Sequence, residues 1–119
     1  MEKTKHIEAV RKAQIELEEL GNRNIRLKEE LSEAVRREVN AAFVEKAERF
    51  QQSFLEKDQI IALLRHDARI LIEKLKLDIA TDADLVQCTR LKADVRRLAS
   101  NASENTLSFQ SFLANEPAN

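Results

Sequence analysis

Apolar residues in the first third of the chain recur in alternating steps of three and four, from residue 10 to residue 34, with charged residues at most other positions. This stripe is two residues in seven wide, which is typical of a coiled-coil seam rather than of the broader face of a globular helix. A helix with so narrow a stripe is marginal in water, so we expect it to pair with another helix. The stripe consists of Val10, Ala13, Leu17, Leu20, Asn24, Leu27, Leu31 and Ala34.

After Leu31 the steps become four residues, through Val35 and Val39 to Phe43, and a seven-residue pattern then resumes. Insertions of this kind locally unwind a left-handed supercoil. We therefore predict one helix over 3–79, about 115 Å long at 1.5 Å per residue. The resumed seam consists of Phe43, Ala47, Phe50, Phe54, Lys57, Ile61, Leu64, Ala68, Leu71 and Leu75.

Gly21 is the obvious place for a break in this helix. The seam passes through it in phase, and the flanking charges, such as Glu18 before it and Arg23 after it, are wrong for helix ends. A glycine inside a helix costs only about 1 kcal/mol relative to alanine. We therefore predict that the helix continues. A break at Gly21 would instead let the chain fold on itself into a three-helix bundle that needs no partner.

A second apolar stripe occurs on another face of residues 60–79, where Leu63, Ile70 and Leu77 recur every seven residues. A two-helix coil would leave these side chains in water, although burying one of them is worth about 1.5–3 kcal/mol. This end of the chain is therefore predicted to form a bundle of three or four helices.

Thr81 is predicted to begin the next helix, because it can cap the helix while Asp84 sits three residues later. We expect a helix over 82–101 that reverses at Ala80-Thr81 and packs antiparallel on 60–79. Its apolar face consists of Leu85, Cys88, Leu91, Val95, Leu98 and Ala102.

Residues 103–119 are rich in Ser and Asn and are predicted to be a flexible tail. Four apolar residues in it, Leu107, Phe109, Phe112 and Leu113, are a weaker candidate for a partner contact.

The composition supports the same architecture, since the 119 residues include one Gly and one Pro. Sandwiches, barrels, α/β domains and phosphate-binding glycine loops all need more of these residues. We predict an all-α fold in which a long coiled-coil helix carries a shorter antiparallel helix on its C-terminal third. The chain is expected to dimerise with a helical-bundle end. The predicted domain is 1–102, with a thin rod over 3–42 and the bundle end over 43–102.

Charge and chemistry exclude several classes of function. The net charge is −1, whereas nucleic-acid-binding domains are usually basic. The single cysteine, Cys88, forms no internal disulfide, and its position on an apolar face makes it a small buried hydrophobe. His6 and His66 are too far apart for a recognisable metal motif. We expect no metal, cofactor or catalytic residue. Without a visible signal peptide or membrane span, we expect a cytoplasmic protein.

The most informative polar residue is Asn24, because a buried Asn in a seam fixes register. The flanking charges leave parallel and antiparallel pairing open. We predict that the oligomer seam includes Val10, Leu17, Leu20, Asn24, Leu27, Leu31, Phe43, Phe50, Phe54, Ile61, Leu64 and Leu71.

The first hypothesis for function is a non-enzymatic coiled-coil scaffold or adaptor that forms a homo-oligomer and contacts another protein. One alternative is a phosphorelay protein using His66, which is followed by Asp67. Another is an architectural nucleic-acid-associated coiled coil, although its basic pairs Arg36-Arg37 and Arg96-Arg97 are diluted by neighbouring acids.

Overall fold

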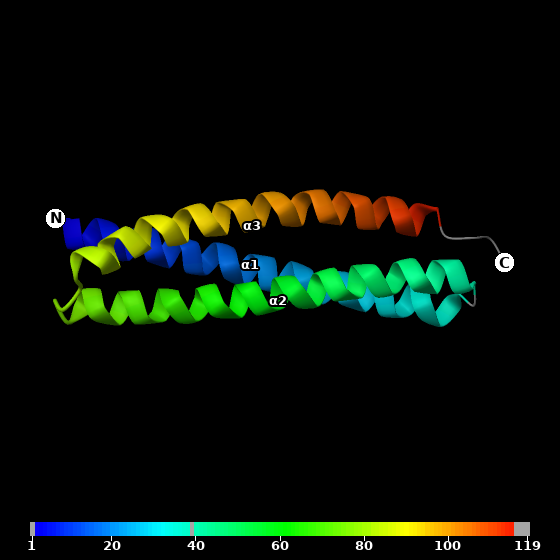
Figure 1. Ribbon diagram of the computed structural model, residues 1–119, viewed down its shortest axis with the longest axis horizontal. Helices are drawn as coiled ribbons and strands as arrows, with labels where there is room; N and C mark the ends of the chain where they lie inside the picture. The colour runs from blue at the N-terminus through cyan, green and yellow to red at the C-terminus, as the bar shows by residue number, and fades with distance from the viewer. Residues whose placement is uncertain (1, 39, 116–119) are drawn as a thin grey trace.

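The computed structural model describes residues 2–38 and 40–115, and these form three long helices. Helix α1 spans Glu2–Arg37, α2 spans Ala41–Lys76 and α3 spans Asp82–Ala114. Consecutive helices run in opposite directions and lie side by side along a rod of 61 × 18 × 18 Å (Figure 1). The all-α prediction is therefore confirmed, and the described part of the chain contains no strand.

The single helix predicted over 3–79 is wrong, because the chain turns back between α1 and α2. Asn40 caps α2: its side-chain oxygen accepts hydrogen bonds from the backbone N–H groups of Ala42, at 2.9 Å, and Phe43, at 3.2 Å. The basic pair Arg36-Arg37 lies in the last turn of α1, where cations complement the helix dipole. The four-residue steps that we interpreted as an unwound supercoil therefore fall on a turn between two antiparallel helices.

Gly21 lies inside α1, so the predicted continuation of the helix through it is confirmed. The three-helix arrangement that we had linked to a break at Gly21 arises instead from the reversal of the chain between α1, which ends at Arg37, and α2, which begins at Ala41.

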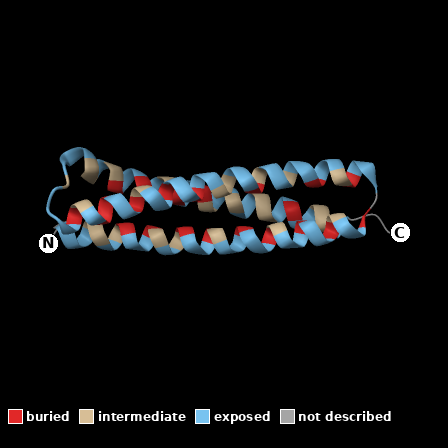
Figure 2. Ribbon diagram, turned by 90° about the horizontal axis from the view of Figure 1, so that it is seen from below, coloured by how far each residue is buried: buried red, intermediate tan, exposed pale blue. Residues whose placement is uncertain are grey.

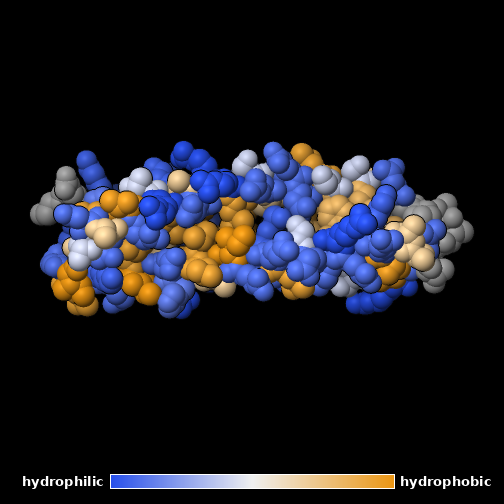
Figure 3. Space-filling view, in the orientation of Figure 1, coloured by the Kyte–Doolittle hydropathy of each residue, from blue (hydrophilic) through white to orange (hydrophobic). Residues whose placement is uncertain are grey.

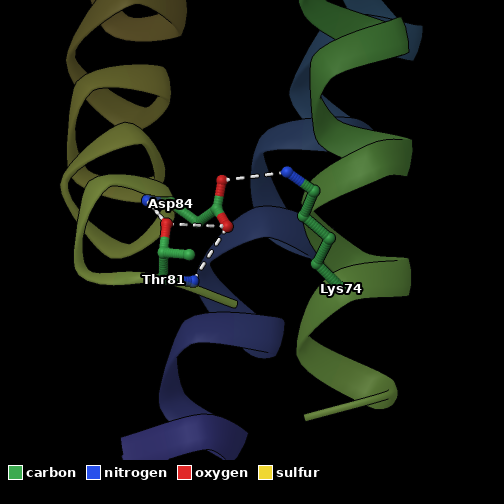
Figure 4. A network of polar contacts seen from close by, with 3 residues as sticks. All are labelled: Lys74, Thr81 and Asp84. Atoms are coloured by element: carbon green, nitrogen blue, oxygen red, sulfur yellow. Dashed lines mark hydrogen bonds and ion pairs between the residues drawn. The ribbon is translucent and has the colours of Figure 1, made fainter. Parts of the chain in front are cut away.

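The predicted reversal at Ala80-Thr81 and its capping box are confirmed. The Asp84 N–H donates to the Thr81 hydroxyl at 3.2 Å, and the Thr81 N–H donates to the Asp84 carboxylate at 2.9 Å. Lys74, near the end of α2, reaches the same carboxylate at 3.2 Å (Figure 4). The backbone hydrogen bond from Thr81, with the help of Lys74, lowers the pKa of Asp84. Asp78, in the turn, has the positive φ of 57° that a helix-terminating residue adopts.

Helix α3 is longer than predicted, because it continues past residue 101 to Ala114. Its apolar face continues too: after Val95 and Leu98 comes Phe109, which is fully buried. Residues 103–114, expected to be a tail, therefore form the last three turns of a packed helix. Residues 116–119 lie outside the described residues.

The core runs the length of the bundle in two clusters, and Figure 2 shows the buried residues on the inner faces of the helices. The longer cluster joins residues of all three helices, among them Leu17, Leu64 and Leu91. The shorter one lies toward the α1–α2 turn and includes Leu31, Phe54 and Phe109. Since α1 contributes to both clusters, residues 3–37 pack against α2 and α3 of the same chain.

Candidate functional site

The predicted oligomer seam lies inside the bundle of a single chain. All of its members are buried except Phe50, which is half-buried. Because helices of the same chain already cover them, these side chains are not available to a second chain in this arrangement. The buried members are Val10, Leu17, Leu20, Asn24, Leu27, Leu31, Phe43, Phe54, Ile61, Leu64 and Leu71.

Asn24 forms a polar contact between α1 and α2 in the middle of the rod. Its side-chain amide donates to the backbone carbonyl of Phe54 at 2.9 Å and also to the carboxylate of Asp58. Lys28, one turn further along α1, forms an ion pair with the same carboxylate. Asn24 is 4% exposed, so a shift of α1 along α2 would leave a buried amide without partners. The register function expected of Asn24 thus operates between two helices of one chain.

Lys57, the polar member of the resumed seam, lies half-buried on α2. Its ammonium group donates to the Ser53 hydroxyl at 2.9 Å. Burial lowers the pKa of Lys57, partly offset by the nearby charge of Glu56.

All five phenylalanines of the chain gather in one cluster between α2 and α3. Phe109 packs edge-on against Phe54, with ring centroids 5.2 Å apart, and Phe43 stacks on Phe112 at 4.6 Å. We did not predict this cluster, because we ended the third helix at residue 101, whereas α3 runs antiparallel to α2 as far as Ala114 and so places residues 109–112 beside residues 43–54. The available signal was the confinement of every phenylalanine to these two segments.

The four apolar residues proposed as a partner contact are divided by the fold. Phe109 is fully buried, Phe112 and Leu113 are half-buried, and Leu107 is 68% exposed. Phe109 is thus a core residue, while Phe112 is partly exposed at the surface.

An open groove lies beside the phenylalanine cluster, between the first turns of α2 and the last turns of α3. Its volume is about 590 Å³. We call it the aromatic groove and define it by its lining residues: Asn40, Ala42, Phe43, Lys46, Phe50, Ser108, Ser111, Phe112 and Asn115.

The outer face of α2 exposes the second apolar stripe of the sequence. Leu63 is 62% exposed, Ile70 41% and Leu77 64%. Figure 3 shows apolar side chains at the surface on the half of the molecule that carries the α2–α3 turn. Helix α3, expected to cover this stripe, packs on a different face of α2. We call Leu63, Ile70 and Leu77 the α2 stripe.

His66 lies on this outer face of α2, exposed, between Leu63 and Ile70. It makes no hydrogen bond or ion pair with any residue that the structure describes. Exposure suits the phosphorelay alternative, but no described carboxylate contacts the ring to orient or activate it.

Cys88 is buried, and this burial raises the pKa of its thiol. The neutral thiol form is the less reactive one, so the position suits a core residue better than a nucleophile. Within residues 2–38 and 40–115, no group of three or more His, Cys, Asp or Glu side chains is placed to hold a metal ion.

The two basic pairs lie at different levels of the rod. Arg96 lines a groove with Ala13 and Glu16, whereas Arg36-Arg37 ends α1. Twenty helical residues separate Glu16 from Arg36, which is about 30 Å. The pairs do not form one basic patch for nucleic acid.

None of the helices, over the residues described, is both apolar enough and long enough to cross a membrane. Comparison with protein families, with curated proteins and with solved structures finds no match for this chain.

Proposed function

We propose that this chain is a non-enzymatic scaffold or adaptor that assembles with a second chain through the outer face of α2. The α2 stripe carries the proposal. Of the ten large apolar side chains that are exposed in the described structure, six lie between residues 55 and 79. These six are Leu55, Ile60, Leu63, Ile70, Leu77 and Ile79.

The seven-residue spacing of Leu63, Ile70 and Leu77 favours another helix as the partner. Leu63 and Ile70 on α2, together with its C-cap residue Leu77, form a narrow line of the kind that another helix covers in a coiled coil or helical bundle. Each large apolar side chain that becomes buried contributes about 1.5–3 kcal/mol. Covering the stripe would add a fourth helix to the three already packed together.

A second copy of this chain is the partner that we propose. Most homo-oligomers use a twofold axis, so one patch meets its own copy. An axis at Ile70 places Leu63 of one chain opposite Leu77 of the other, because both are seven residues from Ile70. In the same antiparallel register, Asp67 of one chain lies within one residue of the level of Lys74 of the other, since they are three and four residues from Ile70, and these charges are opposite.

The test compares solution masses of Ile70→Glu and wild type by sedimentation equilibrium. We expect the wild-type mass to rise with concentration toward twice the chain mass of 13.7 kDa, while Ile70→Glu stays near the chain mass. Ile70 is exposed, so the substitution leaves the core intact. Val86→Glu is the matched control, because Val86 is exposed on α3 and should associate like wild type. A wild-type chain that stays monomeric throughout the micromolar range would contradict the proposal.

A further inference from the structure

The aromatic groove is separate from the α2 stripe, since its lining residues belong to the other end of α2 and to the end of α3. Its volume of about 590 Å³ lies within the roughly 300–1,000 Å³ of small-molecule sites. Its apolar surface comes from Phe43, Phe50 and Phe112. Phe50 and Phe112 are half-buried and tilted by 31°, with centroids 5.1 Å apart, so part of each ring faces the groove.

Aromatic rings prefer other aromatic rings in stacked or edge-on contacts. The Phe43 and Phe112 rings already stack at an interplanar angle of 18°. A further ring entering the groove would extend this arrangement. The lining positions on α2 run from Asn40 to Phe50, about 15 Å along the helix axis. This length suits a molecule with a single ring or with two fused rings.

Among the residues that the structure describes, Lys46 is the one charged residue that lines the groove, and no carboxylate lines it. The Lys46 ammonium group forms no ion pair with any described residue. The remaining polar groups include the hydroxyls of Ser108 and Ser111, which can donate hydrogen bonds. A ligand with one negative charge would meet both a cation and hydroxyl donors.

We propose that the aromatic groove binds a small aromatic anion, with its ring against Phe50 and Phe112 and its anionic group at Lys46. The binding is selective for charge as well as for shape. A neutral molecule of the same outline keeps the ring contacts and loses the attraction to Lys46.

The probe is 2-naphthoate, titrated into the full chain and followed through backbone amide signals by NMR. We expect a dissociation constant on the order of 1 mM, which is usual for a fragment of this size. Signals of Lys46, Ser111 and Phe112 should shift. The neutral analogue 2-naphthamide should bind about two- to fivefold more weakly, since an exposed ion pair contributes a factor of this size.

Variants distinguish binding in the aromatic groove from nonspecific binding elsewhere on the protein. Lys46→Gln should weaken naphthoate binding about two- to fivefold and leave naphthamide binding unchanged. Lys92→Gln is the matched control, because Lys92 is exposed and lines a different groove. Ser111→Trp should block both probes, since Ser111 is an exposed position on the groove wall.

Three results would overturn the proposal: equal affinity for naphthoate and naphthamide, an unchanged affinity in Lys46→Gln, or shifts centred on Leu63 and Ile70 instead of on the groove. The last result would indicate an apolar probe on the α2 stripe. None of these outcomes depends on whether the chain dimerises.

Discussion

The side-chain amide of Asn24 on α1 donates a 2.9 Å hydrogen bond to the backbone carbonyl of Phe54 on α2. The same amide reaches Asp58, which also pairs with Lys28. The contact spans thirty residues of sequence and holds two antiparallel helices in register at mid-length.

Asn24→Ala should lower the free energy of unfolding by about 2 kcal/mol, because it removes a buried hydrogen bond to a backbone carbonyl and a part-buried one to a charged carboxylate. Urea denaturation measures the change. Ile25→Ala is the control: Ile25 is next in sequence and half exposed, so it should change stability by no more than about 0.5 kcal/mol. Equal effects of the two substitutions would show that the Asn24 contact does not stabilise the fold.

Thr81→Ala should lower the free energy of unfolding by about 1 kcal/mol, because it removes one half of the capping box of α3. Thr89→Ala serves as the comparison, since Thr89 is exposed inside α3 and alanine is the better helix former. Thermal unfolding should therefore show a lower midpoint for Thr81→Ala and an unchanged or slightly higher one for Thr89→Ala. A neutral Thr81→Ala would mean that the cap is not formed in solution.

Gly21→Ala should stabilise the chain by about 0.5–1 kcal/mol, since Gly21 lies inside α1 and alanine is the stronger helix former. The added methyl group has room, because its nearest neighbour is the Ile61 Cγ2 atom at 4.0 Å, an ordinary van der Waals distance. A rise in the urea midpoint with unchanged slope is the expected observation. Destabilisation would show that the chain bends at Gly21.

Phe109→Ala should destabilise the fold by about 3–5 kcal/mol, because Phe109 is fully buried among other rings. The matched control is Leu107→Ala, two residues earlier and 68% exposed, which should be close to neutral. The pair distinguishes a packed third helix from the flexible tail predicted from composition. If residues 103–114 were such a tail, both substitutions would be neutral.

The stability of the fold should depend on pH through the ionisation of the Asp84 carboxylate. The pKa of Asp84 is lower in the folded chain, mainly because the Thr81 N–H donates to its carboxylate, so the folded state favours the charged form. The resulting stabilisation is complete well above the unfolded-state pKa of about 3.9 and disappears as the pH falls through the lower folded value. Wild type should therefore exceed Asp84→Asn in stability at neutral pH, and the difference should shrink below about pH 4. A difference that is constant down to pH 2 would assign the stabilisation to something other than this charge.

Local features could be predicted from the sequence because their causes lie within a few residues. Helix formers and the scarcity of Gly and Pro determined the all-α class. The Thr81–Asp84 spacing predicted the start of α3. The uninterrupted apolar pattern predicted that the first helix continues through Gly21. The buried positions were also found, since twelve seam residues chosen by periodicity are buried or half-buried.

The partner of each apolar face was decided only by the tertiary structure. A narrow stripe buries equally well against a second chain or against the same chain, and periodicity does not distinguish the two. Here the turn at Asn40 returns α2 along α1, so the seam closes within one chain. The turn between α2 and α3 brings Phe43 and Phe50 beside the end of α3, where Phe109 completes the core in a segment that composition alone had assigned to a tail. Burial of Phe109 outweighed the weak helix preference of the Ser- and Asn-rich segment around it. Burying an aromatic ring contributes more free energy of folding than a few weak helix formers remove.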